Sequence, residues 1–225
     1  MKLHFHGHAT WRIDHEDTSI LIDPWFTGNP AADCAADAIE KLDAIVVTHG
    51  HADHTTDVED LAKKTGAVVV SNFEIAGHFG EKGCENHAMH VGGGHAFAWG
   101  HVKFTHAQHG SGSAAGELGC AMGVVLTLGG KKIYHAGDTG IFSDMKLISE
   151  LWGPLDVALL PTGDNFTMGV DDAVKATEFL GAGVHIPMHY GTFPLIDTDP
   201  HEFVSRVKDA GRNAVVVAPG AGYTI

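Results

Sequence analysis

The chain has 225 residues, 44% of them hydrophobic, so it can bury a full core and falls within the size range of one domain. Its formal net charge of −14 at pH 7 repels phosphate backbones and argues against general nucleic-acid binding. No run approaches the roughly 20 apolar residues of a membrane span, and no signal-peptide pattern opens the sequence. We therefore expect a cytoplasmic protein that does not associate with membranes.

The pattern of apolar residues predicts strands in the first quarter of the chain and strand–helix alternation in its last part. Capping-box patterns at Thr56–Glu59 and Ser71–Glu74 predict two helix starts, and Gly129-Gly130 predicts a hairpin turn. The predicted strands are Lys2–His6, Thr10–Asp14, Ser19–Ile22, Ala44–Thr48, Ala67–Val70, Val102–Ala107, Cys120–Leu128, Lys131–His135, Asp156–Leu160, Val184–Met188, Val215–Ala218 and Tyr223–Ile225. The predicted helices run from Thr56 toward Lys64, from Ser71 to Gly80 or Gly83, over Asp144–Leu151 and Asp171–Leu180, and onward from Asp199.

Nothing in the sequence divides the chain, because it contains no linker, low-complexity run or fixed-period repeat. Strands and helices must then share one core, most simply as two sheets with helices outside them. We predict a single domain over residues 1–225, of the α/β (α+β) class, with a four-layer αββα sandwich.

The 18 histidines are clustered, and the densest cluster is Thr48-His49-Gly50-His51-Ala52-Asp53-His54. It stands where a predicted buried strand ends and a helix begins, so alternate residues can project toward one point and one stretch can reach two metal ions. Imidazole and carboxylate ligands together suit zinc, manganese or iron. We expect two divalent metal ions, with zinc favoured.

His-x-His-x-Asp-His after a strand resembles the signature of the metallo-β-lactamase superfamily. Further segments resemble its other motifs in the expected order: LIDP at Leu21–Pro24, YHAGDT at Tyr134–Thr139 and IPMHY at Ile186–Tyr190. A finer resemblance is to the ascorbate-phosphate-lactonase-like branch of uncharacterised metal-dependent hydrolases. It rests on HGHAT at His6–Thr10, HGSG at His109–Gly112 and PTGDNFTMG at Pro161–Gly169.

The resemblance implies a ligand set for two metal ions. One ion would be held by His49, His51 and His109, the other by Asp53, His54 and His189, and Asp138 would bridge them. A shared carboxylate and a bridging hydroxide also make physical sense, because two ions about 3.5–4 Å apart repel each other. His106 competes with His109 as a ligand, and we favour His109 because His106 falls inside a predicted strand.

Several other residues are candidates for supporting roles. Asp23 either accepts a hydrogen bond from a ligand histidine or only forms an Asp-Pro turn. His8, in HGHAT, is expected to contact substrate or a ligand. Asp164 and Asn165 either line the mouth of the site or form an ordinary turn. His135 is expected near the site, where it would steady developing negative charge.

These features predict a metal-dependent hydrolase acting on a small-molecule ester, phosphodiester or lactone. The metal ions would lower the pKa of a bridging water toward about 7 and supply hydroxide as nucleophile, with Asp53 and Asp138 taking part in catalysis. One alternative is a di-iron redox protein on the same fold, in which a glutamate typically replaces the histidine found here as His51. Another is a metal-binding protein without catalysis. The motifs leave the substrate and the oligomeric state open, an oligomer included.

Overall fold

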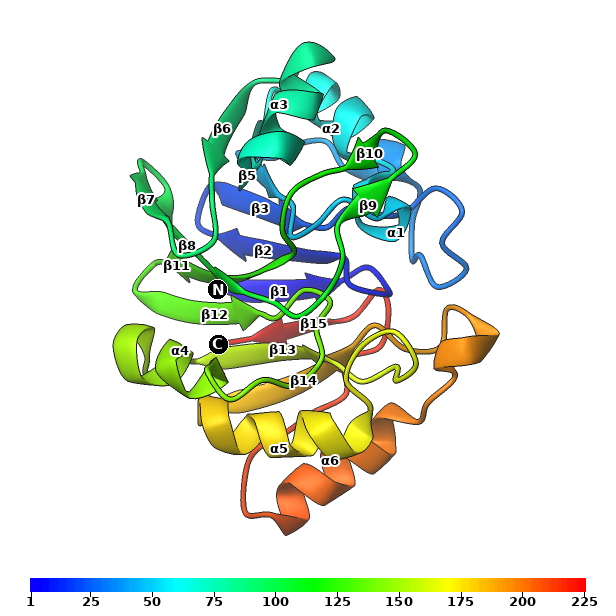
Figure 1. The fold of residues 1–225 in the computed structure, drawn as a ribbon, viewed down its shortest axis with the longest axis vertical. Helices are drawn as coiled ribbons and strands as arrows, with labels where there is room; N and C mark the ends of the chain where they lie inside the picture. The colour runs from blue at the N-terminus through cyan, green and yellow to red at the C-terminus, as the bar shows by residue number, and fades with distance from the viewer.

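Two β-sheets pack against each other at the centre of the computed structural model, which describes residues 1–225 (Figure 1). The strands of the first sheet are β1 (Lys2–Phe5), β2 (Trp11–His15), β3 (Thr18–Ile22), β4 (Ala44–Val46), β5 (Val68–Asn72), β6 (Asn86–Met89) and β15 (Gly222–Thr224). Those of the second are β7 (Gly94–Phe97), β8 (Gly100–His106), β11 (Met122–Leu128), β12 (Lys131–His135), β13 (Val157–Pro161) and β14 (Val184–Met188). Their spatial orders are β15-β1-β2-β3-β4-β5-β6 and β14-β13-β12-β11-β8-β7. A separate short pair joins β9 (Gly112–Ser113) to β10 (Gly116–Glu117).

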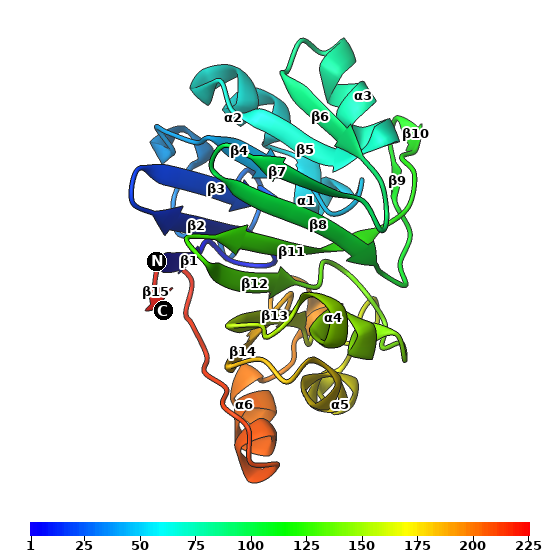
Figure 2. The same cartoon turned by 90° about the vertical axis from the view of Figure 1, so that its left-hand side faces the viewer.

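Helices lie outside both sheets, as Figure 2 shows from the side. The helices beside the first sheet are α1 (Ala52–Thr55), α2 (Val58–Thr65) and α3 (Phe73–Glu81), and those beside the second are α4 (Met145–Trp152), α5 (Val170–Leu180) and α6 (Pro200–Asp209). Two short 3-10 turns span Ala36–Ala38 and Pro194–Ile196. None of these helices has the length and apolar character needed to cross a bilayer. The cytoplasmic location stays a prediction.

Three hydrophobic cores separate the layers. One lies between the sheets, one between the first sheet and α2 and α3, and one between the second sheet and α4, α5 and α6. In β3, Ile20 and Ile22 point into the central core while Leu21 points toward the helices, and β13 alternates in the same way. Strands buried on both faces explain the continuous apolar runs of the sequence. The predicted four-layer αββα sandwich is confirmed.

The topology brings distant loops to one edge of the sandwich. In the second sheet β12, β13 and β14 are parallel, and β8 and β12 are both antiparallel to β11, so β8 runs parallel to β12. In the first sheet β3, β4 and β5 are parallel, and β1 matches their direction because β1 and β3 are both antiparallel to β2. The loops after all these strands therefore leave from carboxyl ends, where α/β proteins bind ligands.

Two local predictions were wrong. Val215–Ala218 forms no strand, because only Ala214 bridges to His185 before the chain crosses back toward β1. The valine side chains of that segment pack into the hydrophobic cores, while its backbone forms no strand pairing. Helix α2 begins at Val58, later than the capping box suggested, because Thr56 ends α1 in a helical conformation and its hydroxyl donates to the Ala52 carbonyl rather than capping α2.

Candidate metal centre

The loop after β4 carries four of the candidate ligands, and close packing fixes its path. A Cβ at Gly50 would come within 2.7 Å of the Ser111 carbonyl oxygen and 3.0 Å of Leu118, so only glycine fits there. The Gly50 amide also donates to Ser111 Oγ at 3.0 Å, and that hydroxyl donates to the Leu118 carbonyl. The loop after β8 thus holds the histidine motif in place.

The first group of side chains consists of His49, His51, His109 and Asp138. The distance from His51 Nδ1 is 3.0 Å to His49 Nε2 and 3.3 Å to His109 Nε2. Asp138 Oδ2 lies 3.5 Å from His109 Nε2 and 3.9 Å from His49 Nε2. A tetrahedral ion with bonds of about 2.1 Å has ligand–ligand edges of about 3.4 Å. The spacing of these four atoms fits such an ion.

The second group consists of His8, Asp53, His54 and His189, whose candidate ligand atoms all lie within 4.8 Å of one another. The Nε2 atoms of His54 and His189 are buried and have no hydrogen-bond partner. A buried polar atom without a partner is costly, and a metal ion would remove that cost. The donor set and these orphaned atoms fit a second divalent ion.

Asp138 contacts both groups. Its Oδ1 lies 3.4 Å from His54 Nε2, and its Oδ2 lies 2.9 Å from His189 Nε2 without hydrogen-bond geometry. The same Oδ2 faces the imidazoles of the first group. The side chain is buried, so water does not satisfy it. One carboxylate therefore stands between the two sets of imidazoles.

Asp23 orients two of the candidate ligands from behind. Its Oδ2 accepts hydrogen bonds from His54 Nδ1 at 2.9 Å and from the Thr48 hydroxyl at 2.6 Å, and its Oδ1 accepts from the Thr48 amide. Because the hydroxyl proton of Thr48 goes to Asp23, its oxygen accepts from His49 Nδ1, 3.0 Å away. Both imidazoles are then protonated on Nδ1, which leaves the Nε2 lone pairs of His49 and His54 toward Asp138.

His8 lies between Thr192 and Asp53. Its Nδ1 is 2.6 Å from Thr192 Oγ1, and its Nε2 is 3.1 Å from Asp53 Oδ2. The carboxylate only accepts, so His8 Nε2 donates to Asp53 and His8 Nδ1 accepts from the Thr192 hydroxyl. The His8 ring also packs against His189, with ring centroids 3.9 Å apart. His8 therefore holds Asp53 in place, and with both ring nitrogens hydrogen-bonded it has no lone pair left for a metal ion.

The backbone is strained at this centre. His8, Asp23 and His189 have φ values of 58°, 49° and 56°, in the left-handed region that residues other than glycine rarely adopt. Such conformations persist where surrounding contacts impose them, and they cluster at functional sites. Here the His189 amide donates to the His8 carbonyl at 2.7 Å, which ties two of the strained residues together.

The electrostatics keep His49 neutral, keep Asp138 ionised and favour a positive charge beside Asp138. Burial, together with His54, holds the pKa of His49 well below 6.5, so its imidazole is neutral at pH 7. Burial opposes ionisation of Asp138, but His189 and His54 outweigh it and hold the pKa of that carboxyl well below 3.8. Burial also opposes protonation of His54, yet Asp138 and Asp23 raise its pKa well above 6.5. A metal ion would take the place of that proton.

Comparison with known proteins identifies the family. The model of the "Beta-lactamase superfamily domain" matches residues 18–190. The chain belongs to the beta-lactamase superfamily. A "UPF0173 metal-dependent hydrolase" of Geobacillus sp. (strain WCH70) is 49% identical over 231 residues and is covered completely, as is this chain. Another from Bacillus thuringiensis subsp. konkukian (strain 97-27) is 48% identical over 93% of this chain and 94% of its own length.

Solved structures agree with this family. The metallo hydrolase Igni18 from the archaeon Ignicoccus hospitalis KIN4/I superposes with a TM-score of 0.91 at 35% identity, over 100% of this chain and 98% of its own. The di-iron β-hydroxylase CmlA from Streptomyces venezuelae, 16% identical, has a TM-score of 0.75 over 100% of this chain and 53% of its own, and shares only the fold. This superfamily member is therefore a metal-dependent hydrolase, as predicted.

Not every residue expected at the centre of this superfamily member is found there. His135 is buried with both ring nitrogens bonded to the backbone, Nε2 to the Ala9 carbonyl and Nδ1 to the Gly137 amide. It therefore has no nitrogen free to stabilise charge, and its expected catalytic role was wrong. His106 is exposed and packs edge-on against Phe142, so the structure brings His109 to the cluster and leaves His106 outside.

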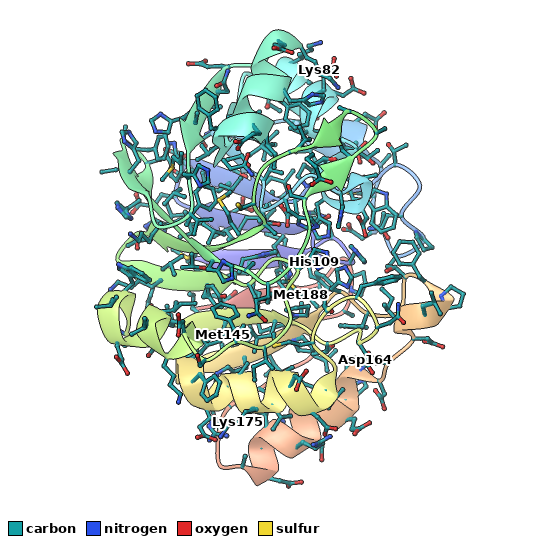
Figure 3. All side chains as sticks on the ribbon, in the orientation of Figure 1. Lys82, His109, Met145, Asp164, Lys175 and Met188 are labelled. Carbon is teal, nitrogen blue, oxygen red and sulfur yellow. The ribbon has the colours of Figure 1, made fainter.

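Asp164 and Asn165 form a turn with positive φ values of 62° and 48° and do not line the cavity, contrary to one of the two interpretations. Figure 3 places Asp164 on the loop before α5, apart from His109. Phe166, the next residue, reaches the cavity instead. Sequence reasoning also missed Thr48 and Thr192. Thr48 offered one signal, a hydroxyl directly before the motif, while Thr192 offered none.

A cavity of about 640 Å³ opens over the centre. Its floor is formed by proposed ligands, and its walls come from loops after β3, β13 and β14. The size is that of a site for small organic ligands. The lining residues are Trp25, His51, Ala52, Asp53, His109, Asp138, Phe166, His189, Phe193, Pro194 and Leu195.

Proposed function

We propose that the chain hydrolyses a small-molecule ester, phosphodiester or lactone at a centre that holds two divalent metal ions. The observation that carries this proposal is the position of Asp138 between two groups of imidazoles. His49, His51 and His109 would hold one ion, and Asp53, His54 and His189 the other. When bound, such ions polarise a substrate oxygen and lower the pKa of water at the site.

The protein's own residues would orient the reactants. Asp53 is partly exposed and lines the cavity, and the hydrogen bond from His8 fixes one of its carboxylate oxygens. Burial opposes ionisation of Asp53, but His8 and His54 outweigh it and lower its pKa, so the side chain is an anion at pH 7. An anionic carboxylate at this place can accept a proton from attacking water and align it with the substrate.

Asp23 and Thr48 would contribute through the ligands rather than by touching the substrate. They fix the tautomers of His49 and His54, which presents neutral lone pairs to the ions without rearrangement. A centre that is pre-arranged in this way needs little reorganisation during reaction.

The donor set favours hydrolysis over di-iron redox chemistry. The position that di-iron redox members of this fold fill with glutamate is His51 here, and zinc accepts a histidine-rich set readily. Zinc is therefore the proposed ion, with manganese and iron as the other two to test.

The test is a substrate panel assayed with defined metals. Protein stripped by a chelator is reloaded with zinc, manganese or iron and assayed on phosphodiester, ester and lactone substrates. We expect turnover that scales with metal content up to two equivalents. His51→Ala should lose metal and activity together, whereas His106→Ala, an exposed histidine outside the cluster, should keep both. Full turnover by metal-free protein, or an iron-dependent visible spectrum without hydrolysis, would refute the proposal.

A further inference from the structure

We propose that the cavity accepts an uncharged ester or lactone with an apolar substituent, and that it rejects metabolites carrying a separate anionic group such as a phosphate monoester. This inference deepens the proposed function and rests on it. It starts from the walls of the cavity, which the metal-ligand motifs do not describe.

Two aromatic rings form one wall. Trp25 follows β3 and Phe193 follows β14, and their rings stack with centroids 5.6 Å apart and planes 23° apart. Trp25 Nε1 donates to the Thr27 carbonyl at 3.0 Å, so its only polar atom is already satisfied by the backbone. The His8 ring packs edge-on against the Trp25 ring, with ring centroids 4.9 Å apart. The wall beside the metal ligands therefore presents ring carbon.

The rim is apolar as well, and it is exposed. Only five large hydrophobic side chains of the chain are exposed, and two of them line this cavity: Phe166 is 50% exposed and Leu195 is 65% exposed. Pro194 stands beside Leu195. Exposed apolar side chains gathered around one opening mark a surface that a ligand or partner covers. The same cavity is lined by the proposed metal ligands, so we take the molecule that covers these apolar side chains to be the substrate.

Cationic side chains are absent from the lining. The chain has 14 lysines and arginines, and none contributes to the cavity, whose polar lining consists of the proposed metal ligands. Proteins bind phosphate groups with arginine, lysine or arrays of backbone amides. An anionic group away from the metals would lose its hydration against apolar walls without gaining a partner. The net charge of −14 also repels anionic substrates at long range.

A pair of hydroxamates tests the inference by binding rather than by turnover. Hexanohydroxamic acid and adipic acid monohydroxamate share a metal-chelating head and chain length, but the second ends in a carboxylate. We measure their affinities for the two-metal protein by calorimetry. The uncharged ligand should bind at least about tenfold more tightly, given the cost of an unpaired anion. Equal affinity, tighter binding of the adipate, or no binding of either would overturn the inference.

Matched substitutions locate the effect. Leu195→Lys puts a cation at the rim and should reduce the preference about tenfold, while Leu151→Lys, at a site 63% exposed on α4, should leave it unchanged. Phe193→Ala should weaken the hexanoyl ligand several-fold through lost apolar contact. Phe73→Ala, at an exposed phenylalanine outside the cavity, should not. If the cavity variant and its control have equal effects in either pair, the cavity walls do not set the selectivity and the inference is refuted.

Turnover of 4-nitrophenyl hexanoate and 4-nitrophenyl hydrogen adipate separates this inference from the proposed function. Hydrolysis of both at equal kcat/KM, or of a phosphodiester alone, would overturn the inference and leave the hydrolase standing. The hydroxamate preference without hydrolysis of any substrate would remove the proposed function and leave the apolar cavity.

Discussion

Replacing Asp23 with Asn tests whether one buried carboxylate fixes the protonation of two candidate metal ligands, His49 and His54. Asp23 is fully buried and accepts from three donors: the Thr48 amide, the Thr48 hydroxyl and His54 Nδ1. An isosteric amide keeps one acceptor oxygen. The backbone amide of Thr48 cannot give up its proton, so that oxygen should face it, and the NH2 group then points at two donors.

The hydroxyl and the imidazole must become acceptors to relieve this conflict. His54 would shift its proton to Nε2, the atom 3.4 Å from Asp138. The Thr48 hydroxyl, turned toward His49 Nδ1, would drive the His49 proton to Nε2 in the same way. Each change removes a lone pair from the metal side. Loss of such supporting hydrogen bonds costs metal affinity about 10–100-fold, or about 1.4–2.8 kcal/mol.

Competition with a chromophoric chelator measures the affinity, and two-bond 1H–15N spectra of the imidazoles report the tautomers directly. Asp57→Asn is the matched control, since Asp57 is also buried and accepts three hydrogen bonds, from the amides of Phe26 and Thr27 and the Thr27 hydroxyl, but touches no candidate ligand. Both variants should lose stability, by about 1–3 kcal/mol. If Asp23→Asn retains wild-type metal affinity, or Asp57→Asn loses as much, the tautomer argument fails.

Three further substitutions have defined outcomes. Gly137→Ala should destabilise the fold by about 1–3 kcal/mol more than Gly130→Ala in urea titrations, because both glycines have positive φ but only at Gly137 would the Cβ meet backbone, 2.6 Å from a carbonyl oxygen. Burial lowers the pKa of His185 below 6.5, so at mildly acidic pH the unfolded chain binds more protons than the folded one. The free energy of unfolding should therefore fall as pH drops from about 6.5 toward the lower folded pKa. His185→Gln should make the denaturation midpoint depend less on pH in this range. Thr192→Val should weaken binding of the second zinc equivalent about tenfold in chelator competition, because His8 loses the hydroxyl donor that fixes its tautomer. An unchanged affinity would exclude a role of Thr192 in metal binding.

The four layers and the ligand cluster could be predicted because their signals are local. His49, His51, Asp53 and His54 fall within six positions at a strand end, and a strand end is readable from the apolar run before it. His109 could be preferred to His106 for the same reason, since the alternating pattern placed His106 inside a strand. The convergence of these loops then follows from strand direction alone.

Features that depend on contacts between residues far apart in the sequence could not be predicted from local patterns. His135 stands within the Tyr134–Thr139 motif, yet its nitrogens are taken by backbone groups from a distant loop and from its own turn. Asp164 and Asn165 were a polar pair in a motif, but the left-handed turn they form directs Phe166 to the cavity. Sequence motifs name the residues and leave the rotation of each side chain undetermined.

The charge balance of the centre links its ligands to its apolar cavity. The two proposed divalent ions would bring four positive charges, and Asp53, Asp138 and Asp23 supply three negative ones, while histidines that bind through lone pairs are neutral. About one positive charge would be left, and the hydroxide nucleophile, or the oxyanion formed when it attacks, would balance it. A second anionic group on the substrate would then find no countercharge, since no lysine or arginine lines the cavity. Aspartates that would neutralise the metal ions and apolar walls that exclude further anions thus favour the same substrates, those that are uncharged before they react.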